Sequence, residues 1–158
     1  MRAGGYTRNV TTKISVAVII DAPRESVFAY IGNIEDQTAW MTDAKKITMT
    51  SSQVQGIGVK FRVDTRIGPL RAQDEMEVTD WVSGRLIKVA HGGLIKGEGI
   101  FTAADYGMGK TLFSWEEELI FPTLLGGRVA EALARPILTR IFQRDLNNLK
   151  RIIEATPS

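Results

Sequence analysis

The order of the predicted elements constrains this chain most: one strand, a short helical region, a series of β-hairpins and one long helix. The amphipathic segment that closes the chain runs from about Gly127 to about Ala155. An antiparallel sheet cannot bury its apolar face alone, and only this last element is long enough to cover such a face. A curved sheet around one helix often leaves a gap that suits an apolar ligand. The order therefore predicts an α+β fold with a ligand cavity.

Alternating apolar residues predict about seven antiparallel strands. In the first of them, residues 12–20, Ile14, Val16, Val18 and Ile20 share one face, which is typical of a half-buried strand. Glycine pairs and the Gly68-Pro69 turn separate the later strands. These later strands are predicted at residues 45–54, 59–67, 70–81, 85–91, 97–106 and 111–121.

Two short helices are predicted after the first strand. Asp21 supplies a capping carboxylate, and Pro23 stands near the first helical position, where proline is favoured. Gly32-Asn33 ends this helix, and residues 34–41 predict a second short helix or turn that carries Trp40.

The last helix is predicted to turn one apolar side toward the sheet. Pro136 lies inside it, and because an interior proline removes a hydrogen bond, we expect a kink or break there, as a candidate gate of the cavity. The apolar side comprises Val129, Leu133, Ile137, Ile141, Leu146, Leu149 and Ile153.

Length and composition indicate one domain at residues 11–156, preceded by a flexible lead-in at residues 1–10. The chain has 158 residues, of which 44% are hydrophobic and 24% charged, as in ordinary globular proteins. No apolar run approaches the roughly 20 residues that span a bilayer. The first residues contain no apolar signal-peptide core, so a cytoplasmic location is expected.

Charge and residue usage argue against several classes of function. A net charge of +2 is too small to indicate nucleic-acid binding. The absence of cysteine excludes disulfides and thiol catalysis. With a single histidine, a zinc site is not expected, and no motif indicates a cofactor. Basic residues on the last helix are consistent with at most transient contact with a membrane surface, although a solvated face is the more common reason for such a bias.

Four segments of the chain resemble the START-like (SRPBCC) superfamily, in particular its bacterial polyketide cyclase/dehydrase and lipid-transport proteins. These segments are VIIDAPRESVF at 18–28, Trp40, GKTLFSWE at 109–116 and DLNNLK at 145–150. The resemblance spans nearly the whole chain and implies a helix-grip fold, in which a curved antiparallel sheet wraps around the C-terminal helix. It implies an apolar cavity between them, but no catalytic motif, because the superfamily has many functions.

Three residues are candidates for acid–base chemistry: Asp74, His91 and Glu117. Alternation places Asp74 and Glu117 on the cavity side of their strands, and a buried carboxylate there is costly unless it has a partner. Each could orient a ligand or move a proton, or have a purely structural role near the cavity mouth. If Asp74 and Glu117 approached each other, they could share a proton, but the sequence does not place them together.

Apolar and aromatic residues are predicted to line the cavity, because methionine and aromatic side chains adapt well to apolar ligands. Each of them taken alone is better explained as an ordinary core residue, and only the set as a whole indicates a cavity. The predicted ligand-binding set, with the two inward carboxylates, is Trp40, Phe61, Asp74, Met76, Tyr106, Phe113, Trp115, Glu117, Leu133 and Ile137.

Three functions remain open. The first is a binder or carrier of a hydrophobic small molecule, such as a lipid, a quinone or a polyketide-like ring system, because no constellation of nucleophile, base and orienting group is visible. The second is a polyketide cyclase or dehydratase, in which an inward acid or base moves protons. The third is a protein-interaction module like the co-chaperone relatives of the superfamily, for which a filled interior is expected.

Overall fold

A computed structural model describes residues 10–93, 95–121 and 126–156. The predicted lead-in, residues 1–10, lies outside the described residues except for Val10, which begins the first strand.

Seven strands form one antiparallel sheet in the order β1-β7-β6-β5-β4-β3-β2. Apart from β1 and β7, every neighbouring pair is consecutive in the chain, so hairpins build the sheet and its first strand is added beside the last. The predicted number of strands is thereby confirmed. The strands are β1 (Val10–Ile20), β2 (Ala44–Met49), β3 (Lys60–Ile67), β4 (Leu70–Val82), β5 (Leu86–His91), β6 (Lys96–Gly107) and β7 (Lys110–Phe121).

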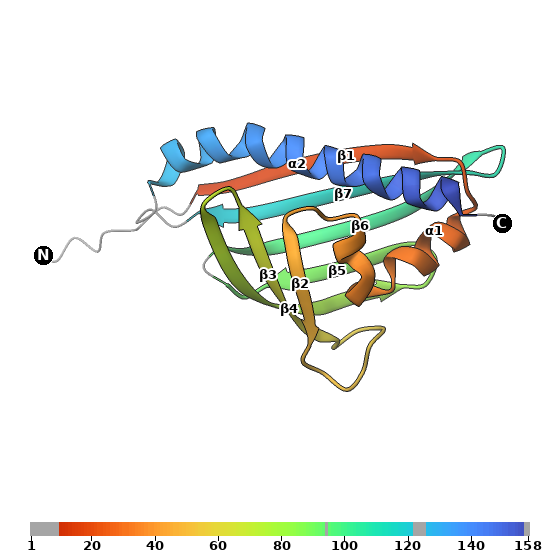
Figure 1. The fold of residues 1–158 in the computed structure, drawn as a ribbon, viewed down its shortest axis with the longest axis horizontal. Coiled ribbons are helices and arrows are strands. Elements are labelled where there is room, and N and C mark those ends of the chain that lie inside the picture. Colours follow the sequence, from red (N-terminus) through yellow and green to blue (C-terminus); the bar gives the residue numbers. More distant parts are fainter. Residues whose placement is uncertain (1–9, 94, 122–125, 157–158) are drawn as a thin grey trace, which may run out of the picture.

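The long helix α2 (Gly127–Ala155) runs along β1 and β7 and covers one face of the sheet (Figure 1). Two short helical segments, α1 (Arg24–Ile31) and η1 (Ile34–Ala39), connect β1 to β2. This arrangement confirms the α+β helix-grip fold.

Two local expectations were wrong, and the break that was one of the two outcomes expected at Pro136 does not occur. Asp21 does not cap α1: Pro23 holds the cap position without a side-chain bond, and the Asp21 N–H donates to Glu154 Oε1 at 2.8 Å. The second strand ends at Met49 rather than at residue 54. The helix α2 continues through Pro136 without a break.

The apolar side of α2 was predicted correctly only in its second half. Leu146, Leu149 and Ile153 are buried, whereas Val129, Leu133 and Ile137 are exposed. In the first half of the helix, a different side packs on the core, the one that carries Ala134, Leu138 and Phe142. Both sides have helical spacing, so periodicity could not choose between them.

Five aromatic rings form the centre of the core beneath α2. Trp115 stacks on Phe142 of the helix, with ring centroids 4.2 Å apart. Trp40 meets Trp115 edge-on at 6.0 Å, and Phe101 lies 5.3 Å from Trp115 and 5.6 Å from Phe113. Edge-to-face and offset contacts of this kind stabilise aromatic clusters, and this cluster joins the sheet to the helix.

Candidate functional site

A cavity of about 190 Å³ lies between the sheet and α2. Its walls are mainly apolar and come from β2–β7, from the segment that precedes β2, and from Leu138 and Phe142 of α2. The helix packs chiefly on β1 and β7, so the space lies over the other strands, where the sheet curves away from the helix.

A buried polar network reaches this cavity from β5 and β7. Glu117 is only 6% exposed, and each of its carboxylate oxygens has a partner. Trp115 donates from Nε1 to Oε1 at 2.8 Å, and His91 Nε2 lies 3.0 Å from Oε2. Because an ionised carboxylate only accepts, His91 donates from Nε2. Both charges are thereby partnered in a place where an unpartnered charge would be costly.

His91 and Glu117 lie on strands that are not neighbours, and glycines in the strand between them allow the contact. The inward positions of β6 read Gly97, Gly99, Phe101 and Ala103. Gly99 pairs with Glu117, and Gly97 pairs with His91. A Cβ on Gly99 would lie 2.5 Å from Glu117 Oε1. Because Gly97 and Gly99 have no side chains, they leave a gap above the β6 backbone. His91 and Glu117 contact each other across this gap.

Asp74 adds a second carboxylate beside His91. Burial raises the pKa of Asp74 above its ordinary value, and the charge of His91 opposes this rise. Burial by itself lowers the pKa of His91, but the hydrogen bond and charge of Glu117, together with the charge of Asp74, outweigh it and raise that pKa. A Cβ on Gly93 would overlap Asp74 Oδ1, so the carboxylate needs a glycine there as well.

The structure brings together all three acid–base candidates, and His91 is the group that links them. It contacts Glu117 directly and interacts electrostatically with Asp74. The sequence left open whether Asp74 and Glu117 form a pair that shares a proton. In the structure the imidazole of His91 interacts with both carboxylates instead.

The predicted ligand-binding residues divide into three groups. Phe61, Asp74, Met76, Trp115 and Glu117 line the cavity, as does His91. Trp40 and Phe113 are fully buried in the core beside it.

Three of the predicted lining residues are exposed and lie outside the cavity wall. Tyr106 is 55% exposed because it lies at the outer end of β6, where the pairing with β7 shifts register between Asp105 and Gly107. Leu133 and Ile137 are 66% and 51% exposed, because the side of α2 that faces the sheet is the adjacent one.

Several lining residues were not foreseen, notably Met41, Asp43, Leu138 and Phe142. Leu138 and Phe142 have helical spacing and could have been found as a second apolar line. Asp43 had no comparable signal, because it lies in a connection rather than in an alternating strand.

Two further observations concern metals and membranes. Within the part of the chain that the structure describes, no three His, Cys, Asp or Glu residues are grouped so as to hold a metal ion. No helix among residues 10–93, 95–121 and 126–156 is long and apolar enough to cross a bilayer.

Solved structures with the same fold include proteins of different functions. The aromatase/cyclase Zhui from Streptomyces sp. R1128 aligns with a TM-score of 0.74 at 14% identity, over 91% of this chain and 94% of that one. A truncated norcoclaurine synthase from Thalictrum flavum has a TM-score of 0.73 at 12% identity, over 94% and 97%. A START superfamily protein from Mycobacterium smegmatis has a TM-score of 0.65 at 16% identity, over 90% and 94%. At these identities the likeness concerns the fold.

No curated protein matches the sequence. Residues 11–154 match the family described as polyketide cyclase / dehydrase and lipid transport. The match covers most of the chain and agrees with the helix-grip fold of the START superfamily. The chain therefore belongs to the polyketide cyclase/dehydrase and lipid-transport family.

Proposed function

We propose that the protein binds one hydrophobic small molecule in the cavity between the sheet and α2, with a polar group of the ligand at the cluster of Asp74, His91 and Glu117. The observation that supports this most is the combination of apolar walls with a buried network of partnered polar groups. Apolar burial supplies affinity at about 25 cal/mol per Å², and a few placed polar groups set orientation.

The chemistry of the cavity favours a ligand with a largely apolar body and at least one oxygen function. A lipid, a quinone and a polyketide-like ring system all fit this description. The direct test is native mass spectrometry of the protein purified from its own host, followed by extraction and identification of the released compound. A stoichiometric apolar compound supports the proposal; an empty protein that also binds no neutral apolar fluorophore contradicts it.

Filling the cavity should abolish this binding. Val89 lines the cavity floor and pairs with Gly99, so Val89→Phe places a phenyl ring next to Glu117. We expect the affinity for the neutral probe N-phenyl-1-naphthylamine to fall by about 30-fold or more, or about 2 kcal/mol. Fluorescence titration measures this effect. The matched control is Val82→Phe, which adds the same ring at a side chain that is 43% exposed; equal loss in both variants would place the probe outside the cavity.

An acid–base enzyme is the second candidate, because Asp74 and His91 both line the cavity with raised pKa values. Groups tuned in this way move protons in many active sites. The two candidates separate with Asp74→Asn: a carrier keeps its affinity within about threefold, whereas an enzyme that uses Asp74 as its base loses about 100-fold or more in turnover of the identified compound. A protein-interaction module with a filled interior is the least favoured candidate, since the interior contains a cavity.

A further inference from the structure

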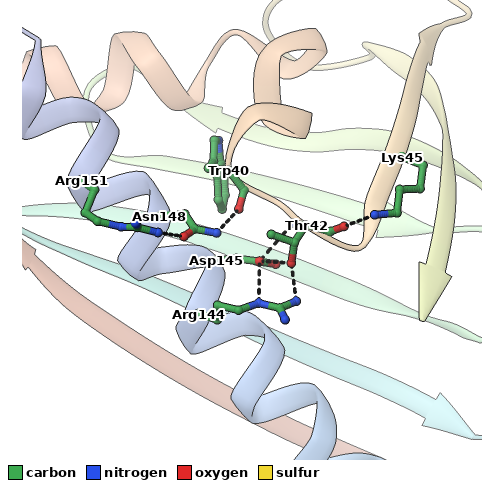
Figure 2. A network of polar contacts seen from close by, with 7 residues as sticks. All are labelled: Trp40, Thr42, Lys45, Arg144, Asp145, Asn148 and Arg151. Atoms are coloured by element: carbon green, nitrogen blue, oxygen red, sulfur yellow. Dashed lines mark hydrogen bonds and ion pairs between the residues drawn. The ribbon is translucent and has the colours of Figure 1, made fainter. Parts of the chain in front are cut away.

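A polar network ties the segment between η1 and β2 to the helix α2 (Figure 2). Thr42 donates to Asp145 Oδ1 twice, from its backbone N–H at 3.1 Å and from Oγ1 at 2.8 Å. Asn148 donates from Nδ2 to the Trp40 carbonyl at 3.3 Å, and Arg144 donates to Thr42 Oγ1. The side chains of Arg144, Asp145 and Asn148 project from α2 toward residues 40–42.

The centre of this network is a pair of carboxyl groups, Asp43 and Asp145. Asp145 is fully buried, and its Oδ2 has no hydrogen-bond partner among the described residues; buried Asp43 Oδ1 likewise has none. Asp43 directly follows Thr42, which donates to Asp145, and Asp43 raises the pKa of Asp145, so the two carboxyl groups are neighbours. Two ionised carboxylates repel each other when no donor lies between them, so a proton retained between these groups would stabilise their contact.

The surroundings of the pair support one retained proton. Burial is the main cause that raises the pKa of Asp145 to about 7; the hydrogen bonds from Thr42 oppose the rise, and Asp43 adds to it. Three charged side chains contact the network. Arg144 Nε lies 4.0 Å from Asp145 Oδ1. Lys45 donates to the Thr42 carbonyl at 2.8 Å, and Arg151 donates to Asn148 Oδ1. Arg144 is exposed and at the limit of ion pairing, so it offsets the burial of Asp145 only in part.

The pair lies at the wall of the cavity. Met41, Asp43 and Ala44 line the cavity from the connecting segment, and Leu138 and Phe142 line it from α2. The contact between residues 40–44 and the helix therefore forms the wall on this side, and its loss would widen the opening of the cavity to solvent.

We propose that the proton shared by Asp43 and Asp145 is a latch: it holds residues 40–44 against α2, and loss of that proton as the pH rises releases the segment and opens the cavity. The latch itself is a property of the fold, and only its effect on a ligand rests on the proposed function. Folding raises the pKa of Asp145 from 3.8 to about 7. The stabilisation of the contact by the proton is therefore full below about pH 4, declines between about pH 4 and 7, and is absent above about pH 7.

Amide hydrogen exchange of residues 40–45, corrected for the intrinsic effect of pH, tests the latch. In the wild type we expect protection to decrease by about tenfold per pH unit between about pH 4.5 and 6.5 and to be constant above about pH 7.5. Asp145→Asn should keep protection constant over the whole range, because its Oδ1 still accepts from Thr42 and its Nδ2 donates to Asp43. Asp43→Asn should do the same by donating to Asp145, which keeps the test valid if one variant does not fold.

The matched control is Glu131→Gln, which removes one negative charge from the same helix away from the pair and should show the wild-type pH dependence. Constant protection in the wild type, or a wild-type pH dependence in Asp145→Asn, overturns the latch.

Stopped-flow release of N-phenyl-1-naphthylamine separates the latch from the proposed function. We expect release to accelerate about tenfold between about pH 4.5 and 6.5 in the wild type and not in Asp145→Asn. Binding with a release rate independent of pH would reject gating by the latch and leave the binding function in place. Exchange that follows the expected pH dependence without any binding of the probe would support the latch and contradict the binding function.

Discussion

Replacing Gly97 with alanine is expected to destabilise the protein by about 3 kcal/mol or more. Gly97 has φ +154°, and a Cβ there would overlap the backbone carbonyl oxygen of Glu118 on β7. Backbone atoms of a central strand cannot rotate away, so β6 and β7 must separate locally and lose hydrogen bonds. Denaturant unfolding, monitored by tryptophan fluorescence, measures the change in the free energy of unfolding.

Gly107→Ala is the matched control for this substitution. Gly107 is also in β6 and also has a positive φ, +93°, but a Cβ there would meet nothing within 4 Å. It should cost only the backbone strain, about 1 kcal/mol. If both variants lost the same stability, the close approach of β7 to Gly97 would not be the cause.

Replacing Glu117 with alanine is expected to cost about 2–3 kcal/mol at about pH 6. The substitution leaves Trp115 Nε1 and a buried, protonated His91 without their acceptor. Because the folded pKa of His91 is raised, the pair stabilises the protein fully below the unfolded pKa of about 6.5 and progressively less as the pH rises through the folded value. The difference in unfolding free energy between wild type and variant should therefore shrink toward about pH 9.

Nuclear magnetic resonance titration gives a second measure of the same interaction. His91 is the only histidine in the chain, so its ring signals are unambiguous. Without Glu117, burial dominates, and the pKa of His91 should fall below its wild-type value. Glu117→Gln should lower the pKa as well while it keeps an acceptor for Trp115. An unchanged titration in both variants would contradict the contact.

Glu118→Ala provides the control for Glu117→Ala. Glu118 is the next residue of β7, its side chain is 50% exposed, and its ion pair with Lys13 spans 3.9 Å at the surface. Exposed pairs of this kind contribute little. We expect no effect on the titration of His91 and little change in stability, so a loss comparable to that of Glu117→Ala would indicate a general effect of charge on β7.

The architecture was predictable because its signals are local. Alternation along β3 and β7 and the apolar periodicity of residues 141–153 follow from the geometry of strands and helices. The end of the second strand was predicted wrongly. Its regular pairing with β3 ends at Met49, and the backbone N–H groups of Thr50 and Ser51 then both donate to the Lys60 carbonyl.

The candidate site was predictable only in part. Asp74 and Glu117 were placed on the cavity side because alternation assigns a face to each residue of a strand. Their partner could not be assigned, because His91 reaches Glu117 over a strand whose inward positions are Gly97 and Gly99. In a sequence, glycine indicates a turn or a weak position in a strand. It does not indicate a gap across which the side chains of two other strands make contact.

The sequence by itself determined the order of strands and helices, the helix-grip family and the inward faces of the central strands, since each of these depends on residues close together in the chain. The tertiary structure decided which side of α2 faces the sheet, where the cavity lies, and that Asp43 lies next to Asp145, which is 102 positions further along the chain. The physical reason is that such contacts depend on the curvature of the sheet and on the docking of the helix. These are collective results of packing the whole core, and no local pattern of residues encodes them.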